Sequence, residues 1–202
     1  MKLKLFLLLA VTILLSAEGA FAAKCAFRQD TNDFFSGVPT LRTEWAPLNP
    51  VSCQGECNAR ASMSMVQESG DNRIEFDVWF TVSSVFVPTQ AKLDDAFIAP
   101  AGTRLQITLA DGTLVELPSA SPVEGQTKIK YPYEDGNDNY ITRVSALFDF
   151  PLNEIDASAL SAQNATTVRV LGASRELTVL LEKKEQGDFM EPIICLREEK
   201  AK

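Results

Sequence analysis

The sequence predicts a mostly β fold: an antiparallel β-sandwich, or an open barrel, with one short helix near residues 153–163 and a set of stapling disulfides. Three observations support this class. Apolar and polar residues alternate along many short segments, turn residues separate those segments, and helical periodicity is missing between most of them. With 202 residues, 46% of them hydrophobic, the chain can bury one core, so we expect one domain.

The clearest strand is predicted over residues 72–82. Ile74, Phe76 and Val78 fall on one face of it, while Glu75 and Asp77 fall on the other. A partner strand is expected at 62–67, because apolar and polar residues alternate there too. The Ser-Gly-Asp-Asn turn at 69–72 would join the two strands as a hairpin.

The strongest short-range hairpin signal is Asp111-Gly112, which lies between alternating runs at 104–109 and 113–117. The same alternation and turn chemistry predict further strands, which we expect at 127–131, 140–150, 167–171, 177–181 and 193–196.

One helix is predicted after Pro151. Asn153 is a favourable N-cap, and Glu154 and Asp156 place negative charge in the first turn, where it complements the helix dipole. Apolar residues then follow at helical spacing on one side through about residue 163.

Residues 1–22 have the pattern of an export signal. Lys2 and Lys4 precede an apolar run at 5–15, and Ala20-Phe21-Ala22 is a signal-peptidase site. The run is too short to span a bilayer, so we expect cleavage after Ala22, a periplasmic or extracellular location, and no membrane-spanning segment afterwards. The remainder is divided into an irregular cysteine-containing arm (23–60), a β domain (61–197) and a charged tail (198–202).

The chain is acidic, with a formal net charge of -8, and this disfavours a nucleic-acid partner. It contains no histidine, which excludes Ser-His and Cys-His catalytic pairs and the common imidazole-held zinc sites. No complete catalytic motif is present either. We therefore expect a non-enzymatic protein without a cofactor or a metal.

The chain has four cysteines: Cys25, Cys53, Cys57 and Cys195. In an exported protein an even number of cysteines is most simply two disulfides. We favour Cys53 with Cys57 across a short turn, and Cys25 with Cys195 as a bridge from the arm to the last strand. The rival pairings join Cys25 to Cys53 or to Cys57.

A Cu(I) site is an alternative use of the same sulfur atoms. Cys53 and Cys57 are followed by Met63 and Met65, and thiolates with thioethers are the ligands that select Cu(I). Two structural cysteines and two core methionines explain the same pattern more simply.

Glu75, Asp77 and Trp79 form the candidate ligand-binding face. Two carboxylates about 7 Å apart on one strand face have the chemistry of a glycosidase pair. The stretch is similar to the Glu-x-Asp-x-x-Glu strand of laminarinase-like glycosidases in two of the three acids, but Phe80 replaces the third. An outward Trp79, with Trp45 or a tyrosine (131, 133 or 140), would still offer a sugar ring or a partner protein a flat apolar surface.

The sequence therefore favours an exported, non-enzymatic protein with a binding or structural role in the cell envelope. Its expected partner is another envelope protein or a glycan. The first alternative is a carbohydrate-binding or weakly glycan-active domain that uses Glu75, Asp77 and Trp79. The second is periplasmic Cu(I) handling through Cys53, Cys57, Met63 and Met65.

Overall fold

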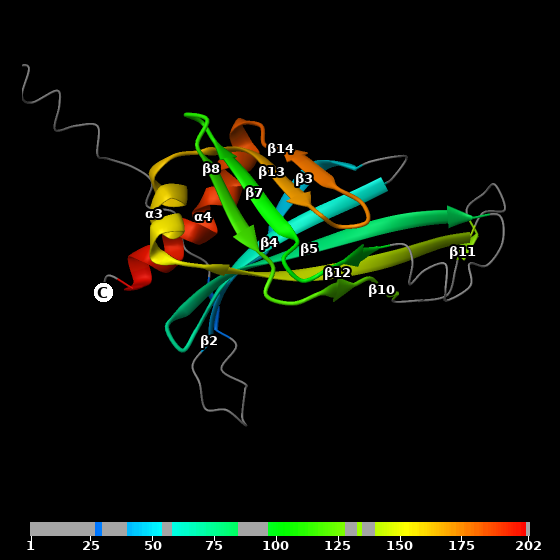
Figure 1. The fold of residues 1–202 in the computed structure, drawn as a ribbon, viewed down its shortest axis with the longest axis horizontal. Helices are drawn as coiled ribbons and strands as arrows, with labels where there is room; N and C mark the ends of the chain where they lie inside the picture. Colours follow the sequence, from blue (N-terminus) through cyan, green and yellow to red (C-terminus); the bar gives the residue numbers. More distant parts are fainter. Residues whose placement is uncertain are drawn as a thin grey trace, which may run out of the picture.

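A computed structural model describes residues 27–29, 40–53, 58–84, 97–127, 133–134 and 140–200 (Figure 1). The proposed signal at 1–22, Cys25 and Cys57 lie outside these residues. The described part is mostly β, as predicted, and its antiparallel sheet is nearly closed into a barrel.

The main sheet runs in the order β10-β12-β5-β4-β3-β14-β13-β7-β8. These strands are β3 (Ala46–Cys53), β4 (Asn58–Glu68), β5 (Asp71–Ser84), β7 (Arg104–Leu109), β8 (Leu114–Pro118), β10 (Gln126–Thr127), β12 (Tyr140–Leu152), β13 (Ala165–Leu171) and β14 (Leu177–Leu180). Three short strands attach beside this path: β1 (Phe27–Gln29), β2 (Thr40–Thr43) and β11 (Tyr133–Glu134). A separate small sheet pairs β6 (Ile98–Ala99) with β9 (Val123–Glu124).

The two ends of the main sheet approach each other. Strand β8 contacts β12, and Ala120, just after β8, donates its backbone N–H to the carbonyl of Asp149 on β12 at 3.0 Å. Of the two predicted architectures, this single curved sheet corresponds to the open barrel. The two-layer sandwich is not confirmed.

Seven of the predicted strands recur with small changes at their ends: those expected at 62–67, 72–82, 104–109, 113–117, 140–150, 167–171 and 177–181. Of the strand expected at 127–131, only residue 127 lies among the described residues, at the end of β10. Strands β4 and β5 form the expected hairpin, and its turn has positive φ at Ser69 and Gly70. The Asp-Gly hairpin joins β7 to β8, with Gly112 at a φ of 88°. These elements follow local rules, because alternation selects the strand and the turn residues tolerate left-handed backbone.

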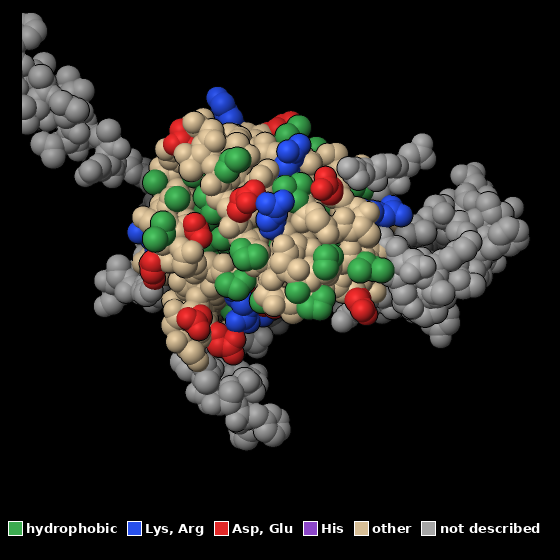
Figure 2. Space-filling model, in the orientation of Figure 1, with side chains coloured by type: hydrophobic (Ala, Val, Ile, Leu, Met, Phe, Trp, Pro, Cys, Tyr) green, Lys and Arg blue, Asp and Glu red, His purple; other side chains and the backbone are tan. Residues whose placement is uncertain are grey.

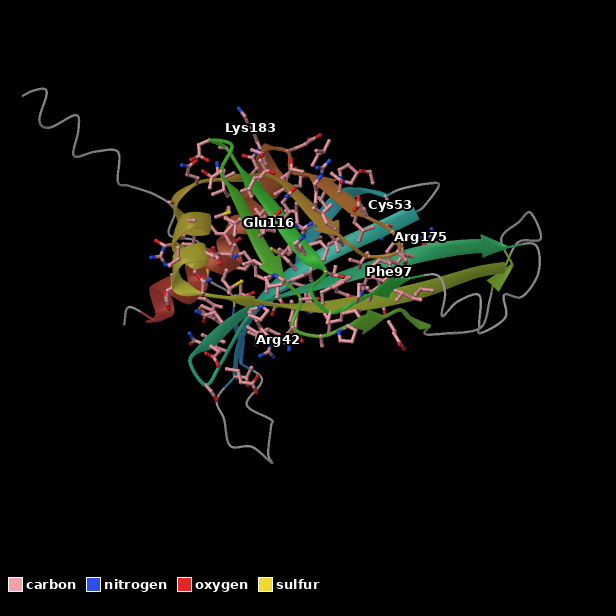
Figure 3. The ribbon with its side chains drawn as sticks, viewed as in Figure 1. Arg42, Cys53, Phe97, Glu116, Arg175 and Lys183 are labelled. Atoms are coloured by element: carbon pink, nitrogen blue, oxygen red, sulfur yellow. The ribbon has the colours of Figure 1, made fainter. Side chains whose placement is uncertain are left out.

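The core lies on the concave side of the sheet. Strand β5 contributes Ile74, Phe76, Val78 and Phe80 to it, and all four are at most 3% exposed. Phe97 packs between β5 and β12, with ring centroids 4.9 Å from Phe80 and 5.6 Å from Phe148 (Figure 3). The side chains of opposite parity on these strands therefore form the outer face of the barrel wall.

Two helices pack at one end of the barrel, at the left of Figure 1. Helix α3 (Glu154–Ala162) is the predicted one, and its N-cap Asn153 accepts a hydrogen bond from the backbone N–H of Asp156 at 2.9 Å. Helix α4 (Lys183–Lys200) contacts α3 and strands β2, β3, β4 and β13.

Helix α4 is a second helix where a single short one was expected, and it corrects two further expectations. Residues 193–196 were predicted to be the last strand, and residues 198–202 a tail, yet residues 193–200 are helical, so Cys195 lies on a helix. Phe189, Ile193 and Leu196 recur at helical spacing and are at most 3% exposed. Pro192 and Gly187 interrupt the run, which obscures this periodicity in the sequence.

The arm expected at 23–60 contributes strands β1, β2 and β3. Strand β3 lies inside the sheet, between β4 and β14, and Leu48 on it is fully buried. The boundary expected between residues 60 and 61 falls within β4, so the described part of the arm belongs to the same barrel wall as the rest of the chain.

No helix in the part of the chain that the structure describes is long and apolar enough to cross a membrane.

Candidate functional site

The predicted residues Glu75, Asp77 and Trp79 lie on the outer face of β5, as expected from the alternation. Their neighbours are set by register. Asp77 is opposite Ser62 on β4 and Leu147 on β12, and Trp79 is opposite Arg60 and Ser145. We call this group the Trp79 face: Arg60, Ser62, Asp77, Trp79, Ser145 and Leu147.

Trp79 is the aromatic centre of the Trp79 face. Its side chain is 36% exposed, and its indole Nε1 donates a hydrogen bond to the Asp77 carboxylate. A directed hydrogen bond from the edge of the ring restricts its rotation, so the indole is held in one orientation along the strand. Leu147, opposite Asp77 and 49% exposed, adds a second apolar side chain to the same face, diagonally across from Trp79.

Polar side chains border this apolar centre. Arg60 is exposed, and Ser62 and Ser145 are partly buried. Together with the Asp77 carboxylate they supply charged and hydroxyl groups on both sides of the indole. The Trp79 face thus combines a flat apolar surface with hydrogen-bonding groups, the arrangement that a hydroxylated ring ligand requires.

Glu75 has a different environment although it is only two residues from Asp77. It is 4% exposed, and its Oε1 lies 2.8 Å from Arg42 Nη2 and 3.6 Å from Arg73 Nη2. Ser64 Oγ donates to Oε2 at 3.4 Å. Burial raises the pKa of Glu75, against the opposing effect of the two arginines.

The cluster around Glu75 extends along the outer face. Arg73 also lies 2.8 Å from a Glu68 oxygen and 3.3 Å from an Asp149 oxygen, so two arginines link three carboxylates. Such a network positions β2, β4, β5 and β12 relative to one another. Glu75 is therefore a structural carboxylate that is closed off from a ligand on the Trp79 face.

The two predicted acids consequently do not form a free pair. Glu75 is engaged by Arg42, and Asp77 accepts a hydrogen bond from Trp79. A glycosidase pair needs one acid as proton donor and the other as base or nucleophile, both facing the same glycosidic bond. The geometry separates Glu75 from that role and leaves Asp77 as a group that orients the indole.

Neither described cysteine is a free thiol: Cys53 and Cys195 are both disulfide-bonded. The pairing of Cys53 with Cys57 and of Cys25 with Cys195 stays a prediction, because Cys25 and Cys57 lie outside the described residues. In Figure 3, Cys53, the last residue of β3, lies far from Arg42 on β2.

The Cu(I) ligand set is not assembled in the described part of the chain. Met63 and Met65 are at most 1% exposed and pack in the apolar core. The proposed Cu(I) set uses the thiolate of Cys53, and a disulfide-bonded Cys53 does not supply one. No group of three or more acidic or thiol side chains suited to a metal occurs among the described residues.

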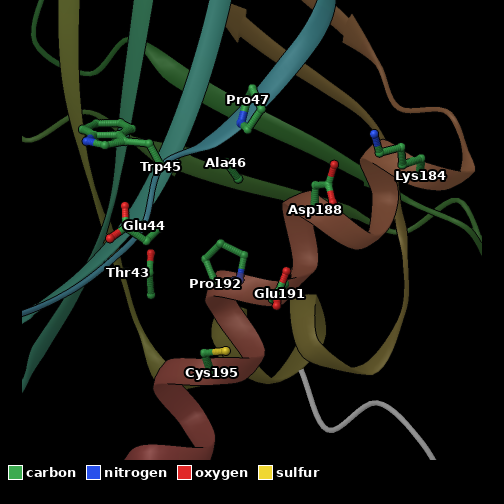
Figure 4. Close-up of a pocket in the computed structure, with 10 residues that line it drawn as sticks. All are labelled: Thr43, Glu44, Trp45, Ala46, Pro47, Lys184, Asp188, Glu191, Pro192 and Cys195. Atoms are coloured by element: carbon green, nitrogen blue, oxygen red, sulfur yellow. The ribbon is translucent and has the colours of Figure 1, made fainter. Parts of the chain in front are cut away.

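A groove that sequence reasoning missed lies between α4 and the segment joining β2 to β3 (Figure 4). It has a volume of about 370 Å³. Its lining includes Glu44, Trp45, Asp188, Glu191 and Cys195. The groove depends on the position of α4, which the sequence pattern did not predict, so no local signal could have located it.

Trp45 shares its exposure of 36% with Trp79 but has other neighbours. It borders the groove, and in Figure 4 its ring points away from α4.

The hydrophobic side chains on the face shown in Figure 2 are scattered among charged ones.

Comparison of the chain with protein-family models, curated protein sequences and solved structures finds no match.

Proposed function

We propose that this protein is an exported, non-enzymatic binding protein of the cell envelope, and that the Trp79 face binds the sugar rings of a glycan. The observation that carries the proposal is the exposed indole of Trp79, which Asp77 orients and Leu147 extends. Burying apolar surface of this kind contributes about 25 cal/mol per Å² to binding.

The chemistry of the Trp79 face matches a pyranose ring. The C–H face of a sugar packs on an indole, and its hydroxyl groups donate to carboxylates and accept from guanidinium and hydroxyl groups. Arg60, Ser62, Asp77 and Ser145 provide such groups around Trp79. The absence of histidine and the engagement of Glu75 by arginine favour binding over hydrolysis.

The export signal and the disulfides belong to the same proposal. Cleavage after Ala22 would deliver the barrel to an oxidising compartment, in which Cys53–Cys57 and Cys25–Cys195 form and staple the fold. The bound glycan would then be a component of the periplasm or of the cell exterior.

The test is glycan-array binding of the mature protein, followed by calorimetry with a glycan that the array identifies. We expect Trp79→Ala to weaken binding at least about tenfold, which corresponds to about 1.4 kcal/mol. Trp45→Ala is the matched control, because it removes an equally exposed indole from another part of the surface. Its affinity should stay close to that of the wild type.

Three results would contradict the proposal. They are binding to no glycan, equal losses in the two tryptophan variants, and release of reducing sugar from an oligosaccharide incubated with the protein. The last result would restore an enzymatic role.

A further inference from the structure

We propose that the groove between α4 and the β2–β3 segment is occupied by the mature N-terminus of this same chain, residues 23–26, held there through Cys25 and Cys195. The proposal is separate from glycan binding, and it rests on cleavage of the signal after Ala22.

The register of β1 directs the chain toward the groove. Strand β1 pairs antiparallel with β2, with Phe27 opposite Thr43 and Gln29 opposite Leu41. If the pairing continues in this register, residues before Phe27 would run alongside residues after Thr43, and Thr43 and Glu44 line the groove. Cys25 precedes Phe27 by two residues, about 7 Å of extended chain.

The groove also contains the half of the predicted bridge that the structure describes. Cys195 on α4 lines it, is 3% exposed and is disulfide-bonded. Continuation of the β1 register would bring Cys25 to the same side of the barrel as Cys195. Cys57 instead follows Cys53, which lies at the other end of β3, seven residues beyond Ala46 of the groove. The geometry thus selects Cys25 as the partner of Cys195.

The charges of the groove complement those of residues 23–26. Glu44, Asp188 and Glu191 line the groove, and Lys184 is the one cation among its described lining residues. None of these four side chains forms an ion pair within the described part of the chain. Cleavage after Ala22 would create an α-ammonium group at Ala23, next to the ammonium of Lys24. Two cations would then meet the excess carboxylates.

Docking of residues 23–26 would depend on cleavage of the signal. Before cleavage, the nitrogen of Ala23 is part of a neutral amide and the apolar signal extends from it. After cleavage, the same nitrogen carries a charge that the groove can bind. Residues 23–26 would therefore dock fully only in the exported, oxidised protein.

The first test is disulfide mapping of the mature wild-type protein, digested without reductant and analysed by mass spectrometry. We expect a linked pair of peptides that contain Cys25 and Cys195. A link from Cys25 to Cys53 or Cys57 would overturn the proposal. This measurement requires no variant.

The second test is the rate of lysine acetylation by a limiting acylating reagent. An ammonium paired with carboxylates has a raised pKa, and a rise of one unit lowers the reactive free amine about tenfold. We expect Lys24 and the Ala23 amine to react severalfold more slowly than they do in a denatured sample. The exposed Lys183 is the internal reference.

A matched pair of double variants separates docking from a general effect of charge. Asp188→Asn with Glu191→Gln neutralises two groove carboxylates and should raise the acetylation rate of Lys24 toward that of Lys183. Glu124→Gln with Glu182→Gln removes the same charge at exposed positions outside the groove and should leave Lys24 protected. Circular dichroism and a cooperative melt establish that both variants are folded. Equal rates for Lys24 and Lys183 in the wild type would overturn the proposal.

Discussion

At the scale of single residues, β5 shows how neighbours decide the role of a side chain. Glu75 and Asp77 have similar side chains on the same face, two residues apart. Arg42 and Arg73 surround the first, whereas the second orients Trp79. Glu75 is 4% exposed and Trp79 is 36% exposed, so of these two side chains only that of Trp79 is accessible from solvent.

The raised pKa of Glu75 predicts a specific pH dependence of stability. Since its pKa in the folded protein lies above the ordinary value of 4.5, the folded state binds more protons than the unfolded state in the interval between the two values. The free energy of unfolding that Glu75 contributes therefore falls as pH rises through this interval.

Glu75→Gln checks this prediction. Urea unfolding of both proteins from about pH 4 to about pH 8 should show the wild type's stability advantage over the variant shrinking as pH rises. If the stability advantage of the wild type instead grew with pH, the ion pairs of Glu75 with Arg42 and Arg73 would outweigh the cost of burying its carboxylate.

At the scale of elements, the two helices have different origins. Helix α3 begins at a local signal, because Asn153 caps it and acidic residues occupy its first turn. Helix α4 begins without such a described cap, carries a proline at position 192 and depends on burial of Phe189 and Ile193 against the barrel. The first helix is encoded locally, and the second is stabilised by packing.

Asn153→Ala removes the cap of α3. We expect it to lower the free energy of unfolding by about 1 kcal/mol, because the backbone N–H of Asp156 loses its acceptor. Ser158→Ala, at an exposed position of the same helix, should change stability by less than about 0.5 kcal/mol. Chemical denaturation measures both. A cap variant as stable as the wild type would show that α3 is held by tertiary contacts alone.

At the scale of the whole molecule, the nearly closed barrel brings distant segments together. Its wall begins with β1 and β2, and α4, close to the C-terminus, packs against β2 and β3. A bridge between Cys25 and Cys195 would connect the chain just before β1 to helix α4. Its entropic effect would be large because the closed loop spans most of the mature chain.

Replacing Cys25 and Cys195 together by serine should therefore destabilise the protein more than replacing Cys53 and Cys57 together. In the chain-entropy model the long bridge contributes about 5 kcal/mol and the short one about 2 kcal/mol. For a chain of this length the first change corresponds to a loss of about 10 °C or more in Tm. Thermal melts of the two double variants provide the comparison, and equal losses would contradict the long bridge.

The sequence by itself determined the parts of this protein that depend on local physics. Alternation defined β4, β5, β7 and β8, turn chemistry joined them as hairpins, and Asn153 marked the start of α3. It also indicated that Asp77 and Trp79 share the outer face of β5, because side-chain parity along a strand needs no tertiary information.

Only the tertiary structure decided how these parts combine. Strand β3 became an interior strand, residues 193–200 became helical, and the sheet curled toward closure instead of forming a confirmed sandwich. The arginine cluster around Glu75 and the groove beside α4 also depend on contacts between segments that are distant in the sequence. Arg42 is 33 residues from Glu75, and Cys195 is far along the chain from Thr43. Contacts over such distances arise from the packing of the whole chain, which no local pattern specifies.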